Sequence, residues 1–176
     1  KLGKTGLDVS LLSFGGGSQF LRNQNGEWEK VLEAAVEGGL NLFDTASTNT
    51  AASFNEGGPK SPDSEDRYGQ ILTKYRNKII LSTKLESRDP EKAKAELEAS
   101  LKRMKTDHVD ILFIHAILPE DNTAEIEKGL YKTMVSLKAS GMTKNIGFSS
   151  MDSAERSAEL IEKLDFDVVL LAMNAT

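Results

Sequence analysis

Three polar residues, Asp44, Lys84 and His115, each end an apolar run of strand length and are the first candidates for chemistry. Taken singly, each has a structural explanation: a turn or helix cap for the Asp, an ion pair for the Lys, and a hydrogen-bonded core position for the His. In a sheet of parallel strands, consecutive strand ends lie on one face. Together these residues therefore predict a titratable cluster of the kind that tunes a proton donor. The spacing of His and carboxylate residues indicates no metal site.

The elements that position this cluster follow from the alternation of apolar runs with amphipathic stretches. Strands are expected over 11–14, 40–45, 78–85, 109–117, 145–150 and 166–173. Helices are expected over 27–38, 64–75, from Asp89-Pro90 onwards, 123–140 and 152–164, with a small hairpin near residues 7–10. Strands with few polar interruptions, linked by helices, indicate parallel strands buried on both faces. Either an open doubly wound sheet or a (β/α)8 barrel fits this pattern.

Composition restricts the class of protein. The 176 residues carry a formal net charge of −5 and no cysteine, and we expect one domain over 1–176. There is no basic cluster for nucleic acid, no apolar run near the roughly 20 residues that span a bilayer, and no secretory signal. A cytoplasmic protein is the default expectation. The sequence lacks an initiator Met and stops after an apolar run, and a barrel needs about 250 residues, so we expect a piece of a longer protein.

Motifs spread along the chain resemble those of the aldo-keto reductase family. Residues 40–46 are similar to the signature around its catalytic Asp, and residues 100–115 follow its SLxRLxxDYVDLYxIH motif closely. Similar segments, in order and at the right spacing, are 2–10, 64–69, 82–84 and 137–150. The resemblance covers essentially the whole chain. It implies a (β/α)8 barrel of this type, with about six of its eight strands present here.

The resemblance also implies a reaction and a cofactor. It implies reduction of an aldehyde or ketone by NADPH, with hydride passing to the carbonyl carbon while a Tyr protonates the oxygen. Lys84, held by Asp44, would lower the pKa of that Tyr, and His115 would orient the carbonyl. Gly16 and Gly17 would lie near the cofactor. The partner is then a small-molecule carbonyl compound, and the oligomeric state stays open.

The nicotinamide carboxamide would be held, by the same resemblance, by Ser149 and Ser150. The family's sixth strand carries a Gln that contacts this carboxamide, and Leu170 stands at the aligned position. Asn174 is a less certain substitute.

One departure bears directly on catalysis, because Asn49 occupies the position of the family's Tyr, five residues after the Asp. An amide cannot supply a phenolic proton and can only hydrogen-bond the carbonyl oxygen. Tyr68, water, Lys84 or His115 would be substitutes. Three hypotheses follow: a carbonyl reductase impaired or altered by Asn49, a cofactor-binding regulatory or structural module on the same fold, and a different barrel enzyme. The sequence does not fix the substrate or the choice of NADPH over NADH.

Overall fold

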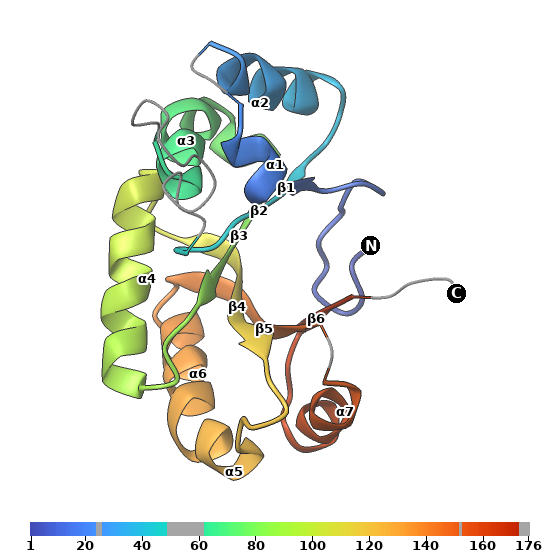
Figure 1. Cartoon of the computed structure of the whole chain (residues 1–176), viewed down its shortest axis with the longest axis vertical. Coiled ribbons are helices and arrows are strands. Elements are labelled where there is room, and N and C mark those ends of the chain that lie inside the picture. Colours follow the sequence, from blue (N-terminus) through green and yellow to red (C-terminus); the bar gives the residue numbers. More distant parts are fainter. Residues whose placement is uncertain (24–25, 49–61, 152, 173–176) are drawn as a thin grey trace.

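Six parallel strands form one sheet and lie side by side in the order in which the chain meets them (Figure 1). The computed structural model describes residues 1–23, 26–48, 62–151 and 153–172. The strands are β1 (Phe14–Gly15), β2 (Leu42–Asp44), β3 (Ile80–Leu85), β4 (Val109–Ile117), β5 (Thr143–Ser150) and β6 (Val168–Leu171). A doubly wound sheet reverses its strand order at a switch point, whereas the order of these described strands runs in one direction only. The sheet is therefore part of the wall of a (β/α)8 barrel, which confirms the predicted fold class.

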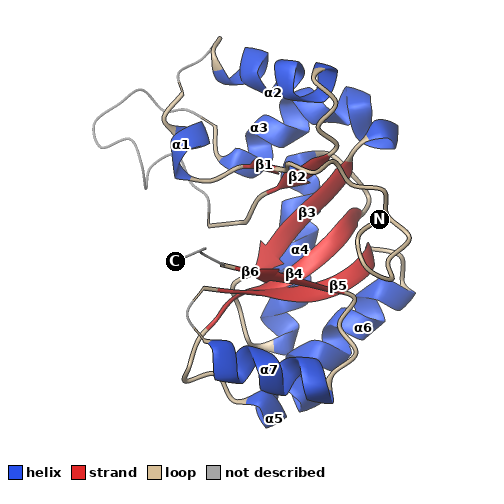
Figure 2. Cartoon of the chain, turned by 90° about the vertical axis from the view of Figure 1, so that its right-hand side faces the viewer, coloured by secondary structure: helices blue, strands red, loops and turns tan. Residues whose placement is uncertain are grey.

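Helices cover the outer face of this sheet, and the N-terminal segment lies on its inner side (Figures 1 and 2). The α-helices are α1 (Ser18–Leu21), α2 (Trp28–Glu37), α3 (Ser64–Ile71), α4 (Pro90–Met104), α5 (Thr123–Ile126), α6 (Lys132–Ala139) and α7 (Ala154–Lys163). A 3-10 helix, η2 (Leu72–Lys78), continues α3, and a π-helical turn, η3 (Glu127–Tyr131), joins α5 to α6. Among the described residues, no helix combines the length and the apolar character that crossing a membrane requires.

Strand β4 shows why the strands have nearly continuous apolar sequences. Leu112 and Ile114 pack into the large core between the sheet and the helices. Ile111 and Phe113, which alternate with them, belong to a smaller cluster on the inner face. That inner cluster is covered by Leu2, Leu7 and Val9. Because both faces of the strand are buried, its apolar residues do not alternate with polar ones.

The start of the chain differs from the prediction. Leu11 and Leu12 are exposed, so the predicted buried strand over 11–14 is wrong at its beginning, and β1 starts at Phe14. The physical reason lies in Asn41, whose side chain accepts a hydrogen bond from the Ser10 backbone N–H at 2.7 Å and donates to the Asp8 carbonyl at 2.8 Å. Just before β1, the Asn41 side chain therefore binds backbone groups that would pair with a neighbouring strand in a regular sheet. The short helix α1 was not predicted either.

The start of α4 follows its sequence signal. The Asp89 side chain accepts a hydrogen bond from the Glu91 backbone N–H at 3.0 Å, and Pro90 occupies the first turn, where its missing N–H costs nothing. The helix ends at Met104, and Lys105 adopts a left-handed conformation with φ of 52°. The helix therefore begins at the predicted residues, and its length brings one of its carboxylates to the loops at the ends of β2 and β3.

A glycine in β5 allows β6 to pack closely, and replacing it should destabilise the sheet. A Cβ atom at Gly147 would overlap the Val168 carbonyl oxygen and lie 3.0 Å from two atoms of the Phe113 ring. We expect Gly147→Ala to lower the free energy of unfolding by about 1–3 kcal/mol, the usual cost of overpacking. Urea unfolding of the full-length protein measures this. Gly15→Ala is the control, because its added methyl group meets no described atom within 4 Å, and equal midpoints for the two variants would contradict the prediction.

Candidate active site

Asp44, Lys84 and His115 come from the carboxyl ends of three adjacent strands, β2, β3 and β4. The strand register places Asp44 beside Ser82 and Lys84 beside Phe113. The three side chains therefore share the edge of the sheet at which barrel enzymes carry their active-site loops. The structure brings them close enough that the charges on Asp44 and Lys84 both act on the His115 imidazole.

Lys84 and Asp44 form a largely buried ion pair. The Lys84 Nζ lies 2.5 Å from Asp44 Oδ2 and donates a second hydrogen bond to the Thr45 carbonyl at 2.7 Å. The Ser82 hydroxyl donates to the other carboxylate oxygen, Asp44 Oδ1, at 2.7 Å. Only 6% of Lys84 is exposed, so these partners supply the hydrogen bonds that water would otherwise give its ammonium group. The ion pair holds the positively charged Lys84 ammonium in one position at the carboxyl end of the strands.

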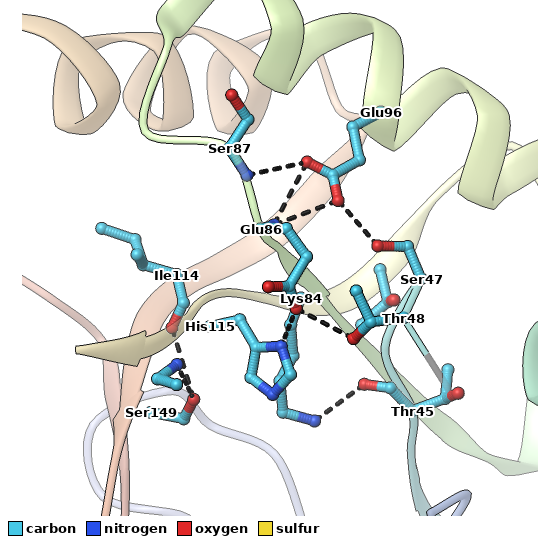
Figure 3. A network of polar contacts seen from close by, with 12 residues as sticks. Thr45, Ser47, Thr48, Lys84, Glu86, Ser87, Glu96, Ile114, His115 and Ser149 are labelled. Carbon is cyan, nitrogen blue, oxygen red and sulfur yellow. Dashed lines mark hydrogen bonds and ion pairs between the residues drawn. The ribbon is translucent and has the colours of Figure 1, made fainter. Parts of the chain in front are cut away.

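His115 contacts a carboxylate that the sequence analysis did not single out. Its Nδ1 is hydrogen-bonded to Oε1 of Glu86, which follows β3 directly (Figure 3). Burial and the positive charge of Lys84 lower the pKa of His115, and the negative charge of Asp44 acts against them. The signal that would have found Glu86 is its spacing, because alternate residues of an extended segment face the same side and Glu86 stands two positions after Lys84.

A second carboxylate, Glu96 of α4, accepts hydrogen bonds from the two segments that follow β2 and β3. Its Oε1 accepts hydrogen bonds from the Ser47 hydroxyl at 2.7 Å and from the Glu86 backbone N–H at 3.0 Å. Its Oε2 accepts one from the Ser87 backbone N–H at 3.2 Å. In addition, the Thr48 hydroxyl donates to Glu86 Oε1 at 3.0 Å. The segments after β2 and β3 are thereby held to the same helix (Figure 3).

The backbone beside His115 is held in an unusual conformation. Ala116 has a φ of 47°, a left-handed value that costs a non-glycine residue about 1–2 kcal/mol. Its N–H donates to the Ser149 hydroxyl at 2.8 Å, and its carbonyl accepts a hydrogen bond from Arg88 at 3.0 Å. Arg88 is itself held by both carboxylate oxygens of Asp121, at 3.0 and 2.8 Å. These contacts fix the direction in which the His115 side chain leaves the strand.

The residues expected near a cofactor have different surroundings. Gly16 is buried, and a Cβ atom there would overlap the Ser64 hydroxyl, so close packing against α3 already requires this glycine. A Cβ atom at Gly17 would meet no described atom within 4 Å. Ser149 and Ser150 are buried at the end of β5, and the Ser149 hydroxyl accepts the Ala116 bond. The Ser149 hydroxyl also donates to the Ile114 carbonyl at 3.4 Å, so its hydrogen is used within the fold.

Four further residues were considered from the sequence: Asn49, Asn174, Leu170 and Tyr68. Asn49 and Asn174 lie outside the described residues. Leu170 is in β6, and its side chain is partly exposed. Tyr68, considered as a substitute acid, is buried, and its hydroxyl donates to the carbonyls of Asp44 at 3.0 Å and of Phe14 at 3.3 Å. Burial and the charge of Asp44 raise the pKa of Tyr68 well above its usual value, which makes this phenol a poor proton donor.

Parallel strands wound in one direction, with helices outside and titratable groups at consecutive strand ends, define a (β/α)8 barrel with its site on the carboxyl-terminal face. The sequence model of the Aldo/keto reductase family matches residues 11–176. The chain belongs to this family.

Curated relatives agree with this assignment. The chain is 31% identical over 163 residues to the uncharacterized oxidoreductase YqkF of Bacillus subtilis, covering 86% of this chain and 48% of that protein. It is 31% identical over 156 residues to the methylglyoxal reductase YeaE of Escherichia coli, covering 84% of this chain and 49% of that protein. The chain thus spans about half the length of the curated relatives it matches. A holo-form aldo-keto reductase structure from Bacillus halodurans superposes with a TM-score of 0.80 at 24% identity, covering 98% of this chain and 56% of that one, which supports the fold.

Proposed function

We propose that the protein containing this chain is an oxidoreductase that reduces an aldehyde or ketone to an alcohol with NADPH. The observation that carries the proposal is the buried Lys84–Asp44 ion pair beside His115, at the carboxyl end of the strands. A fixed positive charge and an imidazole at one point suit a reaction in which negative charge develops on a carbonyl oxygen. Family membership supports the same class of reaction.

The chain's own residues would act on the carbonyl oxygen. NADPH, when bound, supplies the hydride. The Lys84 ammonium stabilises the negative charge that grows on the oxygen, and His115 hydrogen-bonds that oxygen. Asp44 holds the ammonium in place. Ser149 and Ser150 are the residues we propose for the nicotinamide carboxamide, and the open space at Gly17 suits close approach of the cofactor.

The first substrates to test follow from two relatives. One is named methylglyoxal reductase, and another, 29% identical over 177 residues, is named L-glyceraldehyde 3-phosphate reductase, both from Escherichia coli. We therefore propose small polar aldehydes as the substrate class. The experiment is NADPH consumption by the full-length protein with a panel of such aldehydes, with NADH in parallel. If no aldehyde is reduced although NADPH binds, the reductase proposal is contradicted.

That negative outcome would favour the second candidate, a cofactor-binding regulatory or structural module. The observation behind this alternative is Asn49, which stands where the family places its phenolic acid. Measuring the activity of the native protein does not by itself show why Asn stands at position 49. A variant at this position separates a weakened enzyme from a site adapted to another purpose.

We expect Asn49→Tyr to raise kcat/KM for aldehyde reduction by about 10²-fold, the lower end of what general acid catalysis contributes. The family resemblance implies a Tyr at this position that is activated by Lys84, and a neighbouring positive charge lowers the pKa of a phenol so that it donates its proton more readily. Steady-state NADPH oxidation by the full-length variant measures the gain. Asn49→Phe is the matched control, since it adds the ring without the hydroxyl. Equal rates for the native protein and both variants would favour the regulatory module.

A further inference from the structure

We propose that Glu86 makes His115 the acid–base group of this site, by accepting the Nδ1–H of the imidazole and leaving Nε2 to exchange a proton with the carbonyl oxygen. This inference rests on the proposed carbonyl reduction and names the proton donor for it. Glu86 acts through His115 and is therefore a positioning residue. In Figure 3 the His115 ring lies between the Glu86 carboxylate and the Lys84 ammonium group, with Nδ1 toward the carboxylate.

The hydrogen-bond chemistry of the pair fixes the state of the ring. An ionised carboxylate is only an acceptor, so the nitrogen that it contacts must carry a proton. The contact is made by His115 Nδ1, hence the neutral ring has its lone pair on Nε2 and the charged ring has a proton there. A carboxylate on one ring nitrogen orients the imidazole and stabilises its cation when the other nitrogen takes a proton.

Both partners of this contact are held by independent supports. The Glu86 carboxylate accepts the Thr48 hydroxyl bond, and its backbone N–H is bound by Glu96. On the other side, the backbone after His115 is fixed by Ser149 and Arg88 through Ala116. Two side chains held in this way lose little further freedom when they pair, so the contact is pre-organised.

Charged groups of several neighbouring elements lie around His115, and two of them, Lys84 and Asp44, act on its charge. Lys84 of β3 opposes a positive charge on the ring, and Asp44 of β2 favours one. Glu86 makes the direct contact, while Glu96 lies behind it on α4. The Arg88–Asp121 pair borders the following residue. Burial and Lys84 lower the pKa of His115, while Asp44 acts in the opposite direction. The Glu86 carboxylate makes the direct contact that favours a proton on the ring.

The proposed step balances in protons and electrons. As the carbonyl carbon receives the hydride, the π electrons of the C=O bond move onto the oxygen. The oxygen takes the proton from His115 Nε2, and the electrons of that N–H bond stay on the ring, which becomes neutral. Water then returns a proton to Nε2. In the reverse direction the neutral Nε2 takes the proton of the alcohol.

This chain has a particular need for such a donor. Asn49 stands at the family's Tyr position, and Tyr68 is bonded within the core with a raised pKa. Among the described residues, His115 is the titratable donor that combines partial exposure with a position beside Lys84. An imidazole, whose ordinary pKa lies much closer to neutral pH than that of a lysine, suits proton transfer better even though burial and Lys84 lower the pKa of His115.

The test that does not depend on turnover is an NMR titration of the full-length protein with ¹⁵N-labelled histidine, the His115 signals being assigned by their loss in His115→Gln. We expect the Nδ1-protonated tautomer above the pKa of His115. In Glu86→Gln the amide oxygen still accepts the Nδ1–H but the charge is gone, so the pKa of His115 should fall by about one unit or more. The signals of His108 serve as an internal reference. An unchanged pKa and tautomer would overturn the proposal.

The kinetic test measures how the rate of aldehyde reduction depends on pH in the native protein and in Glu86→Gln. Reduction should decline as the pH rises through the pKa of His115, and in Glu86→Gln the decline should begin about one pH unit lower. At neutral pH, kcat/KM should fall on the order of tenfold. Glu98→Gln, an exposed carboxylate on α4, is the matched control and should behave as the native protein. If Glu86→Gln does not fold, Glu86→Asp keeps the charge but retracts it, and a smaller shift in the same direction is expected.

The outcomes separate this inference from the proposed function. If NADPH is not consumed at any pH, carbonyl reduction is contradicted, and the titration still decides whether Glu86 controls the proton state of His115. If reduction occurs and the two pH profiles coincide while the pKa of His115 moves, His115 is not the proton donor and the inference is wrong.

Discussion

Replacing Lys84 by Met in the full-length protein is expected to lower kcat/KM for aldehyde reduction by about 10²–10³-fold, the loss that follows removal of one donor aimed at a developing oxyanion. Methionine has a similar length and no charge. The buried ammonium of Lys84 is held by the Asp44 carboxylate at 2.5 Å and the Thr45 carbonyl at 2.7 Å, and methionine can make neither contact. Steady-state NADPH oxidation measures the effect.

The same substitution should move the pH profile in a defined direction. Lys84 lowers the pKa of His115, so its removal raises that pKa and extends the imidazolium form to higher pH. The decline of the residual rate should therefore begin at a higher pH than in the native protein. Lys94→Met, on the exposed side of α4, is the matched control and should leave both rate and profile unchanged. A Lys84→Met variant within threefold of native activity would exclude Lys84 from the chemistry.

Asp110→Asn is expected to lower the free energy of unfolding by about 1–3 kcal/mol, because it removes a buried carboxylate that is paired with two more exposed cations. Asp110 is 3% exposed near the start of β4. Its Oδ2 accepts the Leu81 backbone N–H at 2.9 Å and lies 2.8 Å from Arg76, while its Oδ1 accepts a bond from Lys144 at 2.8 Å. The amide would leave both cations without their carboxylate. Urea unfolding of the full-length protein at pH 7 measures the change.

The effect should depend on pH in a way that identifies its cause. Burial acts to raise the pKa of Asp110, but hydrogen bonds from Lys144 and Leu81 and the charge of Arg76 outweigh it, so the pKa is lowered. The carboxylate therefore stabilises the fold above the ordinary Asp pKa near 4, and this stability is lost as the pH falls through the lower folded value. The difference in the free energy of unfolding between the native protein and Asp110→Asn should therefore become smaller at acid pH.

Asp107→Asn is the matched control for this prediction. Asp107 lies three residues earlier and its side chain is 93% exposed, so its loss should change stability by no more than about 0.5 kcal/mol. If Asp107→Asn and Asp110→Asn destabilise equally, the buried charge group is not the source of the effect.

The parts of this molecule that could be predicted from sequence are those that depend on local pattern. Apolar runs placed β4 at its observed residues, and the Asp89-Pro90 pair marked the start of α4. The common position of Asp44, Lys84 and His115 followed from a rule of parallel sheets rather than from any contact. Each of these inferences needs only the residues within one element or the order of elements along the chain.

The parts that could not be predicted depend on contacts between distant segments. Leu11 and Leu12 look like strand residues, and only the bonds of Asn41 to the segment before them explain their exposure. The pairing of Glu86 with His115 joins residues 29 positions apart and requires the directions of both side chains. Glu96 looks like one of many charges on an exposed helix face, and only the structure shows it bonded to two loops.

The position of Glu96 also has a consequence for protein engineering. Active-site loops of barrel proteins are attractive units to transplant, since the strands and helices beneath them are shared among many relatives. In this protein the segments after β2 and β3 are not separable units, because one carboxylate from the middle of α4 bonds to both. A graft of either loop into another barrel would need Glu96 and its helical register as well as Ser47, or the acceptor scaffold would receive the sequence of the loop without its conformation.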